Sequence, residues 1–313
     1  ERLHISQPPL SQQIMKLESE LGVRLFARTT RTFELTVAGK ALMNEAAELL
    51  AKMRMTIDTI RQIDRGDCSG PKSARHVLMH PDVDAAVFET ARGGMLREGL
   101  GFDRCQVAVV TNIGAGDHLG LNYITTVEDL AVLKRVIVMN VAPEGYAVLN
   151  ATDPIVVAMA SKCPGGVIYF AAHHHDPVLT AHRAQGKRTI CVDGDHLVAS
   201  EGVWRETIPL RDIPITQGGR IGFQVDNAMA AVGAAWACGL DWDTIRRGLA
   251  TFANDADNAP GRFNVMTYRG ATVIADYGHN PDAMRALVSA VNALPANRRS
   301  VVISGAGDRR DQD

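Results

Sequence analysis

The sequence has no strong charge of one sign, no closely spaced cysteines and no long hydrophobic run. Its 313 residues carry a formal net charge of −2 at pH 7, so there is no global electrostatic signal for nucleic acid. The five cysteines are far apart and none forms a C-x-x-C pair, which indicates reduced thiols in a cytoplasmic protein. The most apolar run, residues 227–240, is too short and too rich in alanine to cross a bilayer. No signal peptide is visible, and we expect no membrane partner.

The first 22 residues have the pattern of an amphipathic helix. Ser6 is a suitable N-cap, and Gly22 is a suitable residue to end the helix. Apolar residues recur at spacings of three and four, at Leu10, Ile14, Leu17 and Leu21. Residues 25–36 alternate polar and apolar side chains around a turn, which predicts a small β-wing. Thr36 is then placed to cap a long helix to about Arg65, whose heptad-like apolar stripe indicates pairing of two chains.

A different pattern begins after the Gly-, Pro- and Ser-rich stretch at residues 65–73. Short β-branched runs then alternate with helical segments, which predicts an α/β fold with a largely parallel sheet. The expected strands lie in residues 85–90, 107–113, 135–141, 146–151, 167–172 and 188–194. An Ala-rich helical pair is expected over 226–252. A final strand–helix–strand unit is expected over 271–278, 281–293 and 300–307.

The N-terminal sequence closely resembles the DNA-binding region of LysR-type transcriptional regulators, over residues 1 to about 65. The stretch "ISQPPLSQQIMKLESELGVRLFAR" carries the resemblance. It implies a partial winged helix-turn-helix and a dimerisation helix, with the helix near Ser6 in the DNA major groove. The residues implied to contact DNA are Ser6, Gln7, Pro8, Ser11, Gln12, Gln13, Arg28 and Arg31. In that family a preceding helix would bury the residues at the positions of Leu10, Ile14 and Leu17. We expect that helix to be missing here.

Polar residues follow several of the expected strands, where open α/β sheets bind their ligands. Glu89 ends one run, and Asn112, Asp117 and His118 follow the next. Further candidates are Lys134, Asn227, Arg262, Asp276, His279 and Asn280. Taken singly, each signal is weak: a lone Glu at a strand end is more often structural, and a lone Lys on a helix is usually solvated. The triplet His173–His175 is interpreted as a solvated loop, and the Arg309–Asp311 run is either a site or a charged terminus.

The ordered set of motifs from about residue 66 onward resembles the Mur-ligase-like C-terminal region of cyanophycin synthetases. The stretch "GPKSARHVLMHPDVDAAVFETARGGMLREGLGFDRC" is the most specific, and "TNIGAGDHLG", "FQVDNA", "PGRFNV" and "DYGHNPDA" follow in order. The resemblance implies an ATP-dependent ligase that phosphorylates a carboxylate, which an amine then attacks. Its implied substrates are ATP, arginine and an aspartate-rich polymer, with Mg²⁺ as cofactor.

By position in that family, Glu89 and His118 would hold Mg²⁺, and Lys134 matches a lysine that is carbamylated in several Mur-type ligases to bind a second metal. These three are the implied catalytic residues. Asn227 would meet the adenine, and Arg262 and Asp276 the phosphates and ribose. Asn112, Asp117, His279 and Asn280 would complete the ATP site. Thr152 stands where relatives usually have an acidic residue.

One motif of the Mur ligases is absent: the loop G-x-x-x-x-G-K followed by Ser or Thr, whose backbone amides bind phosphates. The only Gly-Lys pairs, at residues 39–40 and 186–187, lack the earlier glycine. The expected fold class is therefore α/β, with a Mur-ligase-like central sheet that lacks its phosphate-loop strand and a truncated C-terminal α/β domain. A partial winged helix-turn-helix and a long linker helix precede them. The strands expected on either side of the missing phosphate-loop strand would expose unpaired backbone edges.

The expected domains are residues 1–65, 66–258 and 259–313, in a chain that forms a homo-oligomer if folded. Three functions are compatible with these motifs. The first is a ligase fragment that is inactive alone without its phosphate loop. The second is a LysR-like DNA-binding regulator with a ligase-derived sensor domain, and the third is a chimera with no selected function.

Overall fold

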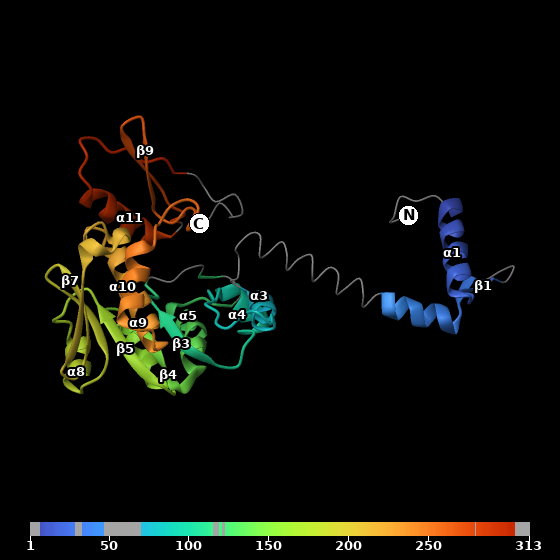
Figure 1. The fold of residues 1–313 in the computed structure, drawn as a ribbon, viewed down its shortest axis with the longest axis horizontal. Helices are drawn as coiled ribbons and strands as arrows, with labels where there is room; N and C mark the ends of the chain where they lie inside the picture. The colour runs from blue at the N-terminus through green and yellow to red at the C-terminus, as the bar shows by residue number, and fades with distance from the viewer. Residues whose placement is uncertain are drawn as a thin grey trace. The chain divides into compact units, whose positions relative to one another are not determined.

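In the computed structural model, the described residues are 7–28, 33–46, 70–114, 119–120, 123–278 and 280–303. The chain divides into two compact units, Glu1–Glu89 and Thr90–Asp313. Each unit is described by itself below, with the element labels of Figure 1. Among the described residues, no helix combines the length and the apolar character that crossing a membrane requires.

The first unit contains the expected helix and wing. Glu18 joins them, since its carboxylate accepts hydrogen bonds from the backbone N–H groups of Leu25 (2.7 Å) and Phe26 (3.1 Å). Gly22 takes a φ of 69° at the end of the first helix, as the sequence predicted. The elements are α1 (Gln7–Leu21), the antiparallel strands β1 (Phe26–Arg28) and β2 (Phe33–Leu35), a helix over 37–46, and α3 (Pro71–Leu78).

Thr36 caps the helix over residues 37–46, which confirms the expected start of that helix. Its hydroxyl accepts a hydrogen bond from the Gly39 N–H (3.0 Å) and donates one to the Arg24 carbonyl (2.7 Å). The apolar face of α1 is only partly covered, since Leu17 and Leu21 stay 39% and 48% exposed. The remainder of the expected linker helix lies outside the described residues.

The second unit is built on a six-stranded sheet in the order β3-β4-β5-β6-β7-β8 (Figure 1). Strands β3 to β6 are parallel, as the alternating pattern predicted, whereas β7 and β8 form an antiparallel extension that the sequence analysis did not predict. The strands are β3 (Cys105–Val110), β4 (Val141–Asn150), β5 (Gly166–Ala171), β6 (Thr189–Asp193), β7 (His196–Glu201) and β8 (Trp204–Pro209).

Helices cover both faces of this sheet and enclose two apolar clusters. One cluster is centred on Leu149 and Met159, and the other on Phe170 and Met229, all of which are at most 2% exposed. Helix α9 packs closely on β4 at Gly233, where a β-carbon would stand 2.7 Å from Val148 Cγ1. The helices are α4 (Arg92–Glu98), α5 (Val127–Lys134), α6 (Val136–Met139), α7 (Pro154–Met159), α8 (Pro177–Ala184), α9 (Gly222–Ala237) and α10 (Trp242–Thr251), with short 3-10 turns at Ala160–Lys162, Leu210–Asp212 and Pro214–Thr216.

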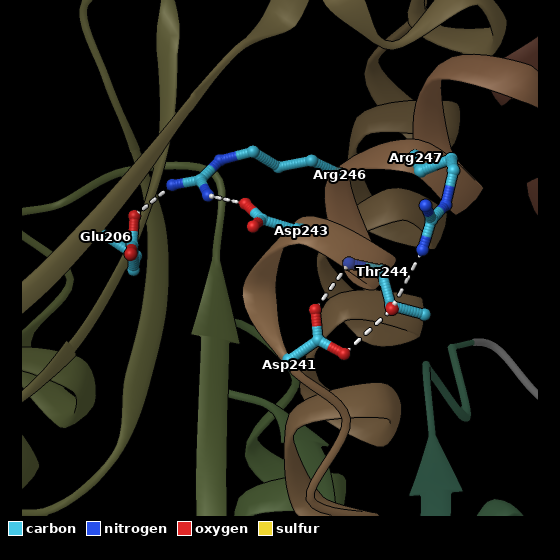
Figure 2. A network of polar contacts seen from close by, with 6 residues as sticks. All are labelled: Glu206, Asp241, Asp243, Thr244, Arg246 and Arg247. Carbon is cyan, nitrogen blue, oxygen red and sulfur yellow. Dashed lines mark hydrogen bonds and ion pairs between the residues drawn. The ribbon is translucent and has the colours of Figure 1, made fainter.

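Helix α10 is fixed by polar contacts at its N-terminal end and along its side, shown in Figure 2. Asp241 caps it through hydrogen bonds from the Thr244 N–H and hydroxyl, both 2.8 Å. Arg246 pairs with Glu206 on β8 and, at 3.4 Å, with Asp243. The tryptophans Trp204, Trp236 and Trp242 lie together beside this helix, with ring centroids 5.3–5.6 Å apart.

The C-terminal part of this unit consists of β9 (Asn264–Tyr268), β10 (Ala271–Ala275) and α11 (Pro281–Ala293). The helix has the predicted bounds. The expected strand over 271–278 forms β10, which pairs antiparallel with β9, a strand that the sequence did not predict. Arg269 and Gly270 both take positive φ angles, 49° and 80°, which is the geometry of a tight hairpin turn. Residues 300–303, expected to begin a strand, are irregular.

Two other expected strands are wrong. Residues 136–139 form α6, because Arg135 stays helical after α5 and the turn buries Val138 completely. Residues 85–90 are irregular, and Val87 is 99% exposed. A strand needs a neighbour for its backbone polar groups, and none of the described strands pairs with residues 85–90.

Candidate functional site

The carboxyl ends of the parallel strands place two loops side by side, and Asp153 joins them. Asp153 Oδ2 accepts hydrogen bonds from the N–H groups of Ile113 (2.8 Å) and Gly114 (3.2 Å), after β3. Its other oxygen accepts from Ile155 (2.9 Å) and Val156 (3.3 Å) in the first turn of α7. One carboxylate therefore serves four backbone donors and fixes the loop that carries Asn112, which is itself exposed. Asp153 was not among the predicted site residues, although an Asp before Pro at a strand end is a helix-cap signal.

Thr152 closes the turn that leads to Asp153. Its N–H and hydroxyl donate to Asn150 Oδ1 at 2.9 and 2.7 Å. Thr152 therefore acts locally in this chain, as part of the turn between β4 and α7.

The loop after β3 also meets the first turn of α11. A β-carbon on Gly114 would overlap Asp282 Oδ2, so the glycine lies directly against that carboxylate. Asn280 caps α11 by accepting a hydrogen bond from the Ala283 N–H at 2.8 Å. Asp276 Oδ1 accepts from the Gly278 N–H at 2.6 Å in the preceding turn. The structure thus brings together two of the predicted motifs, those of Asn112 and of Asp276 and Asn280. Asp117 and His279 lie outside the described residues.

Arg262 is presented by a tightly bonded turn beside α9. The next residue, Phe263, is buried and packs edge-to-face on Phe223 in the first turn of α9, with ring centroids 5.3 Å apart. Asn227 lies one turn further along α9, is exposed, and donates to Gln224 Oε1 at 3.2 Å. The Arg262 side chain is exposed, and its guanidinium has no ion-pair partner among the described residues.

Asp226, beside Asn227, is a carboxyl group whose pKa is strongly raised. Burial raises its pKa from 3.8 to about 6, and the nearby charge of His173 acts in the opposite direction. Asp226 was not among the predicted site residues, because an Asp within a helix gives no signal of its own. Its pKa near neutrality places a titrating group beside the predicted adenine contact.

The structure does not test the metal site predicted from Glu89, His118 and Lys134, because Glu89 and Lys134 lie in different compact units. Glu89 is exposed in the irregular segment 85–90 and belongs to the first unit, so its expected position at a strand end is wrong. Lys134 ends α5 and is half-buried, and His118 lies outside the described residues. Within the described ranges, no three His, Cys, Asp or Glu side chains gather as a metal site would require. The imidazole of His174 lies 3.8 Å from Asp193, and His175 is exposed.

The predicted DNA contacts fall on the first unit. Gln7, Pro8 and Ser11 lie in α1, where Gln12 and Gln13 are exposed on the next turn. Arg28 ends β1. Ser6 and Arg31 lie outside the described residues.

Comparisons with protein families match three successive parts of the chain. Residues 1–40 match the model of bacterial regulatory helix-turn-helix proteins of the lysR family. Residues 40–235 match the Mur ligase middle domain, and residues 261–313 match the Mur ligase glutamate ligase domain.

Individual relatives agree with these matches. A cyanophycin synthetase from Synechocystis sp. is 43% identical over 254 residues, which cover 80% of this chain and 29% of the relative. One from Nostoc sp. is 40% identical over 252 residues, covering 80% and 28%. The HTH-type transcriptional regulator TfdT from Cupriavidus pinatubonensis is 45% identical over 67 residues, covering 21% and 29%. The chain spans less than a third of the length of these relatives.

Among solved structures, crystal structure I of MurF from Acinetobacter baumannii has a TM-score of 0.46 at 19% identity, covering 61% of this chain and 38% of that one. A pseudomurein peptide ligase type C from Methanothermus fervidus has a TM-score of 0.46 at 22% identity, covering 70% and 47%.

Proposed function

Because the chain belongs to the Mur ligase family through its middle domain, we propose that residues 90–303 form the nucleotide-facing part of an ATP-dependent, amide-bond-forming ligase. The packing of Gly114 against Asp282 supports this most directly. It places the loop of Asn112 and the first turn of α11 at one edge of the parallel sheet. Ligands of open α/β sheets bind at that edge.

The proposed reaction resembles that of cyanophycin synthetases. A carboxylate oxygen of an aspartate-rich polymer attacks the terminal phosphorus of ATP, which forms an acyl phosphate and releases ADP. The amine of arginine then attacks the acyl carbon, loses a proton and displaces phosphate. In this chain, Arg262 would bind phosphate oxygens through its guanidinium, and Asn227 would contact the adenine. Asp276 and Asn280 would border the same nucleotide.

Magnesium is part of the family's chemistry, but among the described residues no three His, Cys, Asp or Glu side chains gather as its ligands would. Glu89 lies in a separate compact unit and is exposed. We therefore assign no step to Mg²⁺ here, and the metal-binding roles of Glu89, His118 and Lys134 remain predictions.

The absence of the phosphate loop sets the expected level of activity. No G-x-x-x-x-G-K motif occurs in the 313 residues, so the phosphates lack the backbone amides that normally bind them. We expect this chain alone to bind ATP weakly and to ligate far more slowly than an enzyme with the loop.

Calorimetric titration with ATP and magnesium chloride tests the nucleotide site. Arg262→Ala should weaken binding roughly 5- to 30-fold, the effect of losing a charged hydrogen bond of about 1–2 kcal/mol. Arg269→Ala is the control, since Arg269 lies in the exposed hairpin turn and stacks on Tyr268. The absence of ATP binding by folded wild-type protein would contradict the proposal, as would equal affinities of the two variants.

A second proposed function, DNA binding, is favoured by the match of residues 1–40 to the lysR-family model and by the exposed Gln12 and Gln13 on α1. Fluorescence anisotropy with a labelled duplex at about 50 and 200 mM salt should show affinity that falls steeply with salt. Gln12→Ala and Gln13→Ala should reduce sequence preference more than salt dependence. The absence of binding at the lower salt concentration would exclude this function for the chain.

A further inference from the structure

The turn that carries Arg262 is held by two asparagine side chains. Asn254 Nδ2 donates hydrogen bonds to the carbonyl oxygens of Arg262 (2.6 Å) and Phe263 (3.4 Å). Asn264 Oδ1 accepts from the Gly261 N–H at 2.7 Å. The backbone is therefore fixed on both sides of Arg262 and at Arg262 itself.

The two asparagines are also linked to each other. Asn264 Nδ2 donates to the Asn254 carbonyl (3.2 Å) and to the Ala259 carbonyl (2.9 Å). Asn264 is 2% exposed, so these bonds are shielded from water. A buried amide that lost its partners would leave unsatisfied polar groups, which makes the arrangement sensitive to single substitutions.

The conformation that these bonds maintain is unfavourable for the residue that follows Arg262. Phe263 has a φ of 55°, in the left-handed region that bulky side chains rarely adopt. Its ring is nevertheless buried against Phe223. A turn of this kind persists only where its surroundings impose it, and the Asn254 and Asn264 amides supply that constraint.

We propose that Asn254 and Asn264 are positioning residues that hold the Gly261–Phe263 turn in one conformation and thereby fix Arg262 on a turn that packs against the first turn of α9. The contact of Arg262 with nucleotide phosphate rests on the proposed function. The hydrogen bonds of Asn254 and Asn264 to the turn form a clamp, and this clamp does not depend on the proposed function. All hydrogen bonds described for these amides join them to backbone groups, so they act on the nucleotide through Arg262.

Limited trypsin digestion of the full chain tests the clamp without nucleotide. Cleavage after Arg262 requires the turn to open, whereas cleavage after Arg269, in the exposed hairpin turn, gives an internal reference. Asn254→Asp and Asn264→Asp keep the side-chain shape but remove the amide donors. Each should speed cleavage after Arg262 roughly 5- to 30-fold relative to cleavage after Arg269, the effect of about 1–2 kcal/mol on local opening.

Asn258→Ala, in the same loop, should leave the ratio unchanged, since Asn258 bonds only to Asp255 among the contacts described. Equal ratios in all variants would overturn the proposal.

ATP titration then separates positioning from a general structural role. If the amides act through Arg262, the Arg262→Ala/Asn264→Asp double variant should bind ATP no more weakly than Arg262→Ala alone. Additive losses would overturn the positioning role. If the wild-type chain binds no ATP, the proposed function fails, and the digestion ratios still decide whether the clamp exists.

Discussion

Gly114 and Asp282 are 168 positions apart in the chain and are in direct contact, with no room for a β-carbon between them. Gly114 follows β3, and Asp282 lies in the first turn of α11, where it pairs with Arg285. The contact joins the central sheet to the C-terminal segment at the edge where the proposed nucleotide site lies. Both the left-handed backbone of Gly114 (φ 57°) and this proximity favour glycine.

Gly114→Ala should therefore destabilise the protein for two reasons. The left-handed conformation should cost about 1–2 kcal/mol, and displacement of the Asp282 side chain adds a second penalty. Gly239→Ala is the control, because Gly239 ends α9 with a φ of 77° but has open space around its α-carbon. Urea denaturation should show a larger loss for Gly114→Ala. Asp282→Ala should remove the difference, and equal losses in the two glycine variants would contradict the contact.

Asp153 should contribute more to stability than an ordinary helix cap. Asp153→Ala removes the acceptor of four backbone amides, two of them outside the helix that it caps. Asp176 offers a close control, because it precedes a proline and caps α8 through Val178 and Leu179 alone. We expect Asp176→Ala to cost about 1 kcal/mol and Asp153→Ala about 2–3 kcal/mol. Urea denaturation provides the comparison, and similar losses would mean that the loop after β3 gains little from Asp153.

Much of the fold could be predicted from local sequence patterns. Thr36 signalled the start of the helix over 37–46, and Gly22 signalled the end of α1, because caps and breakers act on their immediate neighbours. The strands at 136–139 and 85–90 were predicted wrongly for a reason that is not local. A β-branched run forms a strand only where another strand pairs with it, and tertiary packing decides this.

The candidate site was predictable as a set of loops but not as a set of contacts. The order of motifs located Asn112, Arg262 and Asn280, whereas Asp153 emerged only from its hydrogen bonds to backbone groups about 40 positions away. Asn264 lies within a quoted motif, but its role in the turn emerged only from its hydrogen bonds to nearby backbone groups. Burial, which sets the pKa of Asp226, is likewise a property of the packed structure.

Arg188 should stabilise the second unit through stacking more than through charge. Its guanidinium lies 4.6 Å from the Tyr146 ring centroid and 4.5 Å from that of Trp236, and its Nε is 3.1 Å from Glu201. Arg188→Lys keeps the charge but loses the planar group, so we expect a loss of about 1–2 kcal/mol. Arg205→Lys, on an exposed side chain of β8, should change stability by less than about 0.5 kcal/mol. Tryptophan fluorescence can follow the unfolding of the second unit and so measure its stability, because all three tryptophans lie in this unit. Equal effects of the two substitutions would exclude the stacking contribution.

Asp226 should make the stability of the second unit depend on pH in the direction opposite to most carboxylates. Its pKa is raised from 3.8 to about 6 by burial, so the folded state binds a proton that the unfolded state has released between these values. Stability should therefore fall as pH rises from about 4 to about 6, and the full penalty should be present above that range. Asp226→Asn should match the wild type near pH 4 and exceed its free energy of unfolding by on the order of 2–3 kcal/mol at pH 7. Asp103→Asn, at an exposed turn, should show no such divergence. Urea denaturation across this pH range makes the comparison, and a constant difference between Asp226→Asn and wild type would show that Asp226 does not titrate there.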